Sequence, residues 1–269
     1  MQLYQYIRIL SLDVVAGACI SSLFIARLLN VDLPFSVVLA LGLAVWIIYT
    51  LDHLIDGVKI GHEAGSIRHR FHQKHASTIA LFLVTALAIS GINLFYLPVP
   101  TLKIGMSMVI LVVIYFVILQ AFRTRNIFFK ESSISLIYTC GLFVGPISLS
   151  ASWSVTVIPV FLQFLGLSLA NLLLFSLLEH EMDKKDGHSS IVLSFGEERV
   201  KILSWMAILL VWAMALLQVS MGMDLSIPAL ISLMAFLLGL ILLRPGYFLE
   251  QERYRIVGDG IFLIPVFLI

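Results

Sequence analysis

Charged residues are scarce in this sequence. Only 12% of the 269 residues are Asp, Glu, Lys or Arg, whereas 60% are hydrophobic and the mean hydropathy is +1.04. Soluble domains carry about 25% charged residues, so roughly half of the usual charged surface is missing. This shortage excludes an ordinary water-soluble fold and predicts a chain that has lipid as its solvent.

Two other shortages narrow the range of functions. The net charge is only +1, which argues against a nucleic-acid-binding surface. The chain has only two cysteines, Cys19 and Cys140, and both lie inside apolar runs. We interpret them as small core residues rather than as a disulfide or a metal-binding pair.

Long uncharged segments are what the sequence has in abundance. A helix needs about 20 residues to cross the hydrocarbon core of a bilayer. We therefore expect an all-α polytopic membrane protein of about nine transmembrane helices, folded as a single membrane domain over residues 1–269. In the longest run the natural break extends from Gly145–Pro146 to Ser154, and the first and last segments are weaker because they contain Asp13 and Asp259. The predicted segments are Tyr6–Leu29, Leu33–Leu51, Ser77–Leu102, Ile104–Phe122, two crossings within Ser132–Leu178, Ile202–Met223, Leu225–Leu243 and Tyr254–Ile269.

The distribution of Lys and Arg predicts the orientation. With a cytoplasmic N-terminus, only Arg27 and Lys103 of the 17 basic residues lie on the outer side. Cytoplasmic loops are enriched in Lys and Arg, so this bias places the N-terminus in the cytoplasm. The fifteen inner residues are Arg8, Lys59, Arg68, Arg70, Lys74, Arg123, Arg125, Lys130, Lys184, Lys185, Arg199, Lys201, Arg244, Arg253 and Arg255.

Two similar acidic motifs end the second and sixth predicted helices. They read Leu-Asp-His-Leu-Ile-Asp over residues 51–56 and Leu-Glu-His-Glu-Met-Asp over residues 178–183, and a Gly-His pair follows each. Because the motifs lie four helices apart, we expect two related halves of about 1–125 and 126–245, with a ninth helix at about 254–269. Both helices run inward, so both motifs should reach the same depth on the cytoplasmic side.

The spacing within each motif suggests a cation site. Asp52 and Asp56 are four residues apart, as are Glu179 and Asp183, so each pair lies on one helical face. Mg²⁺ prefers oxygen ligands and typically combines one or two carboxylates with substrate phosphates. We therefore expect Asp52, Asp56, Glu179 and Asp183 to hold Mg²⁺ and a diphosphate. The inner loops supply basic candidates to bind its remaining oxygens, namely Arg68, Arg70, Lys74, Arg123, Arg125, Lys130, Lys184 and Lys185.

These residues resemble the motifs of the UbiA superfamily of intramembrane prenyltransferases. Family members carry Asn-Asp-x-x-Asp-x-x-x-Asp at the end of helix 2, whose last two acids match Asp52 and Asp56. The second family motif, Asp-x-Glu-x-Asp-x-x-x-Gly-x-x-Thr, resembles residues 179–190, and the run Leu193-Ser194-Phe195-Gly196 that follows is also similar. Ile48 and Tyr49 stand where the first motif has Asn and Asp, and Glu179 replaces an Asp. The resemblance covers nearly the whole chain.

The resemblance implies a nine-helix bundle around a central cavity that opens to the cytoplasm, and it implies an enzyme. Such an enzyme transfers an isoprenyl group from an isoprenyl diphosphate, with Mg²⁺, to a small acceptor of aromatic or quinone-like type within the membrane. The allylic cation formed in this reaction needs a dry cavity with aromatic faces, and the candidate walls are Trp46, Tyr49, Tyr115 and Tyr138. Asn171 and Asp13 either face the same cavity or bond a neighbouring group. Tyr49 and Asn171 are both candidates for contact with the substrate.

Three other interpretations stay open at this point. Acids at helix ends also mark the membrane boundary, although two matching pairs on one side favour a site. All seven histidines lie at or beyond the inner ends of helices 2 and 6, which suggests a di-iron membrane oxygenase, yet such enzymes usually have adjacent His-His pairs and none occurs here. The third interpretation is a transporter or a catalytically silent UbiA-like binding protein, because acids within a membrane can also take part in proton coupling.

Overall fold

The computed structural model describes residues 2–59, 67–122, 127–151, 155–186 and 190–269, all of them helical or in short connections. Some side chains near the gaps, including those of Asp56, Lys130 and Asp183, lie outside the description. In chain order the elements are α1 (Gln2–Ile9), α2 (Leu12–Leu28), α3 (Phe35–Lys59), α4 (Ile67–Lys74), α5 (Ala76–Asn93), η1 (Leu94–Tyr96), α6 (Val99–Phe122), α7 (Ile127–Leu149), α8 (Val157–Asp186), α9 (Ile191–Phe195), α10 (Glu197–Ser220), α11 (Ser226–Leu243), α12 (Pro245–Leu249), η2 (Glu250–Glu252), α13 (Arg253–Gly260) and η3 (Ile261–Leu268).

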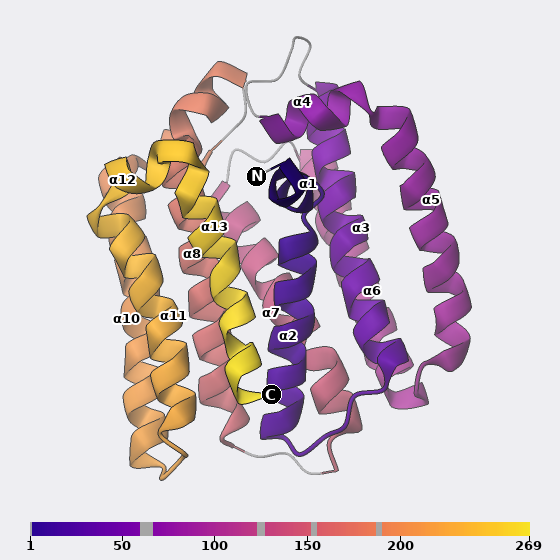
Figure 1. The fold of residues 1–269 in the computed structure, drawn as a ribbon, viewed down its shortest axis with the longest axis vertical. Helices are drawn as coiled ribbons and strands as arrows, with labels where there is room; N and C mark the ends of the chain where they lie inside the picture. Colours follow the sequence, from indigo (N-terminus) through magenta and orange to yellow (C-terminus); the bar gives the residue numbers. More distant parts are fainter. Residues whose placement is uncertain (1, 60–66, 123–126, 152–154, 187–189) are drawn as a thin grey trace.

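The long helices form a bundle of nearly parallel rods (Figure 1). Six segments in the described residues are long and apolar enough to cross a membrane, as expected for a polytopic α-helical membrane protein. A further apolar segment, Val99–Tyr115, is shorter. The six are Phe35–Ile55, Ala76–Tyr96, Glu131–Leu149, Val157–Met182, Glu197–Ser220 and Ser226–Leu243.

Three boundaries differ from those predicted. The first segment is interrupted at Ser11, whose φ of 54° lies in the left-handed region, so α1 and α2 are separate helices. The fourth long helix begins at Val99 and therefore includes Lys103. The break predicted from Gly145–Pro146 to Ser154 begins later than expected, because α7 continues through Pro146 to Leu149 and α8 begins at Val157. Proline is tolerated inside membrane helices when another group bonds the carbonyl four residues earlier, and here the Ser22 hydroxyl donates to Leu142 O at 2.8 Å.

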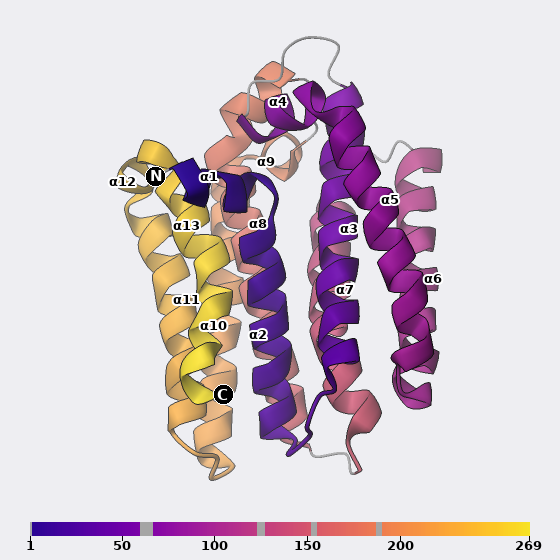
Figure 2. The ribbon, with the colours of Figure 1, turned by 45° about the vertical axis from the view of Figure 1, so that its right-hand side comes forward.

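Helix α8 lies at the centre of the bundle, where it packs against α7, α10, α11 and α13. Small residues allow these close approaches. A Cβ on Gly166 would lie 3.0 Å from Ala207 O of α10, and a Cβ on Gly258 of α13 would overlap Asn171 and Phe175 of α8. By contrast, α5 and α6 lie at one edge (Figure 2) and expose apolar side chains such as Phe82 and Ile110, as lipid contact requires.

The two helices that carry the acidic motifs end at the same end of the bundle (Figures 1 and 2). Helices α1, α4, α9 and α12 gather at this end, which we call the motif end. The C-terminus lies toward the other end, where Arg27 donates to Ile269 O at 2.7 Å. The common depth predicted for the two motifs agrees with this arrangement.

Candidate functional site

Both acidic motifs lie within helices rather than in the loops that follow. The uncharged part of α3 ends at Leu51, yet the helix continues to Lys59, and α8 continues past Leu178 to Asp186. Asp52 and Glu179 are therefore fixed on rigid elements, and both are half-buried. Asp56 and Asp183 belong to the same two helices, but their side chains lie outside the described residues.

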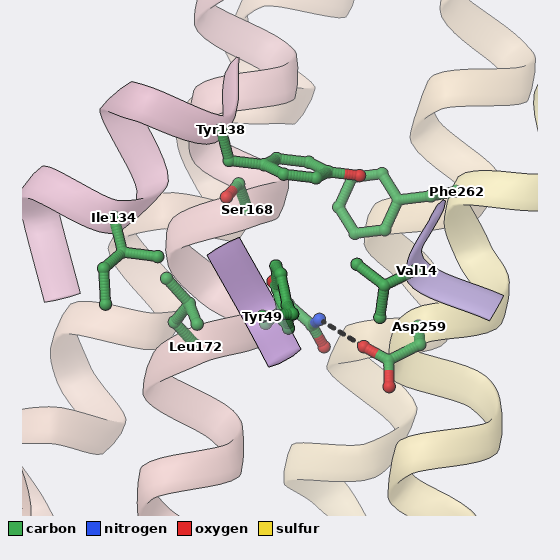
Figure 3. A pocket seen from close by; sticks show the side chains of 9 residues that line it. Val14, Tyr49, Ile134, Tyr138, Ser168, Leu172, Asp259 and Phe262 are labelled. Carbon is green, nitrogen blue, oxygen red and sulfur yellow. Dashed lines mark hydrogen bonds between the residues drawn. The ribbon is translucent and has the colours of Figure 1, made fainter. Parts of the chain in front are cut away.

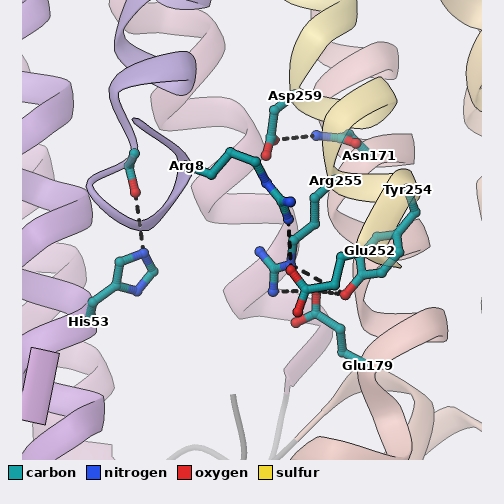
Figure 4. Close-up of polar contacts among 9 residues, drawn as sticks. Arg8, His53, Asn171, Glu179, Glu252, Tyr254, Arg255 and Asp259 are labelled. Atoms are coloured by element: carbon teal, nitrogen blue, oxygen red, sulfur yellow. Dashed lines mark hydrogen bonds and ion pairs between the residues drawn. The ribbon is translucent and has the colours of Figure 1, made fainter. Parts of the chain in front are cut away.

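Glu179 is engaged by α13, the helix that opens the C-terminal segment (Figure 4). Arg255 Nη2 lies 2.5 Å from Glu179 Oε1, and the Tyr254 hydroxyl donates to the same oxygen at 3.0 Å. Arg255 Nε in turn donates to the Tyr254 oxygen at 3.3 Å. In the described part of the chain Oε2 has no hydrogen-bond or ion-pair partner, so one oxygen of Glu179 stays available to a cation or ligand.

Tyr254, Arg255 and Asp259 were not among the predicted site residues. A signal for them was present, because Arg255 and Asp259 are four residues apart in an otherwise apolar terminal segment. That spacing places both on one helical face, and ionisable residues at membrane depth generally have partners or a function. The sequence does not show which residues of α8 they contact; the structure shows that these are Glu179 and Asn171.

Arg68 is a predicted basic residue that lies beside this network. It lies within electrostatic range of Glu179, Asp259 and Arg255, and its Nε is buried without a hydrogen-bond partner in the described structure. Burial, followed by the charge of Arg255, lowers the pKa of Arg68. A guanidinium with an unsatisfied donor next to two acids is a suitable contact for a phosphate oxygen.

The other predicted basic residues lie at the surface or outside the described residues. Arg70, Lys74, Lys184 and Lys185 are exposed. Arg123 and Arg125 lie outside the described residues, as does the side chain of Lys130. Arg68 is thus the predicted basic residue whose described side chain is placed within electrostatic range of Glu179 and Asp259.

A small pocket lies deeper in the bundle, between α2, α3, α7, α8 and α13 (Figure 3). Its volume of about 20 Å³ holds a water-sized molecule, because one water needs roughly 10–15 Å³ by this measure. The predicted central cavity, large enough for an isoprenyl chain, is therefore not confirmed by this pocket. The lining residues are Val14, Tyr49, Ile134, Tyr138, Ser168, Asn171, Leu172, Asp259 and Phe262.

The polar groups of the pocket are only partly satisfied. Asn171 Nδ2 donates to Asp259 Oδ1 at 3.4 Å, so Asn171 both lines the pocket and bonds a neighbouring helix. Asn171 Oδ1 and the Tyr138 hydroxyl are buried and have no hydrogen-bond partner in the described structure. Buried polar groups are nearly always hydrogen-bonded, so these two atoms suggest a bound polar group.

Comparisons with family models, curated proteins and solved structures give no match. The site must therefore be judged on its own geometry.

The donor set suits Mg²⁺ only together with a ligand. Among the side chains that the structure describes, no three His, Cys, Asp or Glu residues lie close enough to hold a metal ion. This search does not include Asp56 and Asp183. Mg²⁺ usually takes one or two carboxylates and completes its shell with water and phosphate oxygens, so Asp52 and Glu179 each carry a group of the kind that this ion binds.

Histidines also meet near the motif end. The rings of His53 and His72 are 5.3 Å apart, and His72 Nδ1 donates to Arg68 O at 2.9 Å. This bond makes His72 a support for the backbone of α4 at Arg68. His62, His188 and the side chain of His69 lie outside the described residues, and the oxygenase interpretation stays a prediction.

Proposed function

We propose that this chain is an intramembrane transferase that moves an isoprenyl group from an isoprenyl diphosphate to a small acceptor. One observation carries the proposal. Helices α3 and α8 bring their acidic segments to the same end of the bundle, and Arg68 lies within electrostatic range of Glu179 there. Carboxylates for a divalent cation and a guanidinium for phosphate are the parts that diphosphate binding requires.

The proposed architecture has nine crossings. Six are the long apolar segments described above, and α2, α6 and the α13–η3 segment supply the other three. We further propose that the motif end faces the cytoplasm, because 15 of the 17 Lys and Arg residues fall in the sequence segments predicted to be on the same side as the motifs. This arrangement is the one that the UbiA-like motifs imply.

Each part of the proposed site has a separate task. Asp52, Asp56, Glu179 and Asp183 would hold Mg²⁺, which neutralises charge on the departing diphosphate. Arg68 would bind a diphosphate oxygen, while Arg255 and Tyr254 fix Glu179 in place. The isoprenyl carbon would face inward, where the aromatic rings of Tyr49 and Tyr138 would stabilise positive charge and apolar neighbours would exclude bulk water.

Thermal unfolding tests binding directly. We expect geranylgeranyl thiodiphosphate, an unreactive analogue, to raise the Tm of the purified protein in the presence of Mg²⁺ and much less in its absence. Asp52→Asn should abolish the Mg²⁺-dependent part of the shift. Glu250→Gln is the matched control, because Glu250 is a largely exposed acid paired with Arg253. No shift with wild-type protein, with or without Mg²⁺, would overturn the proposal.

Two measurements separate the alternatives. An oxygenase predicts stoichiometric iron in the purified protein, and a transporter predicts flux into liposomes without release of pyrophosphate. A Tm shift without pyrophosphate release would instead indicate a binding protein that has lost catalysis.

A further inference from the structure

The pocket between α7, α8 and α13 has a distinct chemical character. Its walls are mostly apolar or aromatic, and besides Tyr49 and Ser168 it is lined by polar residues of three different helices: Tyr138, Asn171 and Asp259. Asn171 is 7% exposed, and its Oδ1 is an unused acceptor. The Tyr138 hydroxyl is an unused donor. A group that both donates and accepts a hydrogen bond would satisfy both atoms.

We propose that this pocket binds a hydroxyl group and that Asp259 takes the proton from it during transfer. The inference deepens the proposed function and rests on it. A water molecule can donate one O–H to Asn171 Oδ1 and the other to Asp259, whereas the hydroxyl of an acceptor has a single O–H, which it would donate to Asp259 in the reacting arrangement. The volume of about 20 Å³ fits one such group.

The position of the pocket suits an attack on the isoprenyl group. Asn171 is eight residues before Glu179 on α8, which places it about 12 Å deeper along the helix at 1.5 Å per residue. Tyr49 is three residues before Asp52 on α3, so the pocket lies inward of both acidic motifs. Arg68 lies within electrostatic range of both Glu179 and Asp259, so a diphosphate that it binds would present its first isoprenyl carbon, C1, to the end of the pocket that Asp259 forms.

The proposed step is balanced without any further reactant. The hydroxyl oxygen bonds to C1, and the bond from C1 to the diphosphate oxygen breaks with its electron pair leaving on the diphosphate. The O–H proton passes to an Asp259 Oδ atom. Asn171 holds the carboxylate through its Nδ2, while Tyr138 donates to the attacking oxygen and orients a lone pair toward C1.

The groups around Asp259 favour this role. Asp13 of α2, Arg68 of α4 and Arg255 of α13 lie within electrostatic range of its carboxylate. Tyr49 of α3 and Tyr138 of α7 also lie within electrostatic range, and Asn171 of α8 donates to it. Burial and the charge of Asp13 favour the protonated form of Asp259, whereas Arg68 and Arg255 favour the carboxylate, so this side chain is suited to take and hold a proton inside the bundle.

Asp259→Asn tests the base, because it keeps the shape and the contact with Asn171. We expect the Mg²⁺-dependent Tm shift with geranylgeranyl thiodiphosphate to be unchanged, while pyrophosphate release from geranylgeranyl diphosphate falls about 100-fold or more. Wild-type turnover should decrease toward acid pH, and this decrease should be absent in the variant. Full turnover in Asp259→Asn would overturn the inference while leaving the proposed function intact; absence of the wild-type shift would instead remove the proposed function.

Product analysis identifies the source of the hydroxyl. Without an added acceptor in H₂¹⁸O, attack by water predicts geranylgeraniol that carries ¹⁸O. With phenol, attack by an acceptor hydroxyl predicts the geranylgeranyl phenyl ether. Either product supports the inference, whereas a ring-carbon product alone would overturn it.

Tyr138→Phe tests the pocket without reference to turnover. If the hydroxyl bonds a bound water, its removal should lower the Tm of the ligand-free protein, with Tyr96→Phe on the exposed Tyr96 as a neutral control. If the Tyr138 hydroxyl is unsatisfied, its removal should raise the Tm, because an unpaired buried hydroxyl is destabilising. A raised Tm would count against a bound hydroxyl.

Discussion

The guanidinium of Arg255 lies 2.5 Å from the carboxylate of Glu179 and joins α13 to the helix that carries the second acidic motif. The exposed fractions of the two side chains are only 11% and 20%, so water screens the pair weakly. Tyr254 and the ring of Phe175, 5.4 Å from the guanidinium, complete its surroundings. The ion pair between Arg255 and Glu179 thus joins the C-terminal segment to the proposed site.

Arg255→Ala should therefore be strongly destabilising. Removing one partner of a buried ion pair leaves the other charge uncompensated, and the typical cost is about 3 kcal/mol or more. Arg253→Ala is the matched control, because its partner Glu250 is 68% exposed and such pairs contribute about 1 kcal/mol or less. Thermal unfolding in detergent compares the two. Equal losses of Tm in the two variants would show that the buried Arg255–Glu179 pair stabilises the fold no more than the exposed Arg253–Glu250 pair.

The sequence was sufficient to predict that this is a helical membrane protein and that the two acidic motifs lie at the same end of the helix bundle. Long uncharged runs and the Lys and Arg bias depend on local composition, which one sequence shows directly. The motif helices extend through Asp52 and Glu179 because nothing in either hexapeptide breaks a helix. Ser11 and Pro146 show the limit of such rules: Ser11 adopts left-handed geometry, whereas Pro146 stays helical.

The partners of the site residues could not be predicted in the same way. Arg255 meets Glu179, and Asn171 meets Asp259, only because α13 packs on α8. The two helices can approach this closely because residue 258 is a glycine, which has no Cβ to collide with α8. The sequence alone does not show that a helix packs against this glycine. The suggested relation between residues 1–125 and 126–245 stays a prediction.

Gly258→Ala should disturb both the fold and the pocket. A Cβ there would overlap Asn171 Oδ1 and approach Phe175 Cε1 to 2.7 Å, so α13 would have to move away from α8. Overpacking of this kind costs about 1–3 kcal/mol. Gly260→Ala, two residues away on the same helix, meets nothing within 4 Å and should leave the Tm unchanged or slightly higher. If both variants melt alike, the contact is looser than described.

Acid should destabilise the protein through His72. Burial lowers the pKa of His72 below its ordinary value of 6.5, outweighing its hydrogen bond to Arg68 O. Below pH 6.5 the unfolded chain therefore binds more protons at this position than the folded chain, and the free energy of unfolding decreases as the pH falls through that window. We expect a smaller decrease of Tm between pH 7.5 and 5.5 in His72→Gln, whose amide can still donate to the carbonyl. Identical pH profiles would assign the acid sensitivity to other groups.

Cysteine labelling tests the orientation on which the proposed site depends. In a background with Cys19 and Cys140 replaced by alanine, Lys103→Cys should react with a membrane-impermeant maleimide added to intact cells. Lys185→Cys, at the motif end, should react only after permeabilisation. Both lysines are exposed, so a difference in labelling reports the side of the membrane and not burial.

The opposite labelling pattern would have a specific consequence. Isoprenyl diphosphates and millimolar Mg²⁺ are cytoplasmic, and a doubly charged headgroup does not cross the hydrocarbon core unaided. With α3 and α8 ending on the outer side, Asp52 and Glu179 would face a compartment without that substrate. The fold would stand, but diphosphate transfer would have to give way to a transport or binding function for the same buried network.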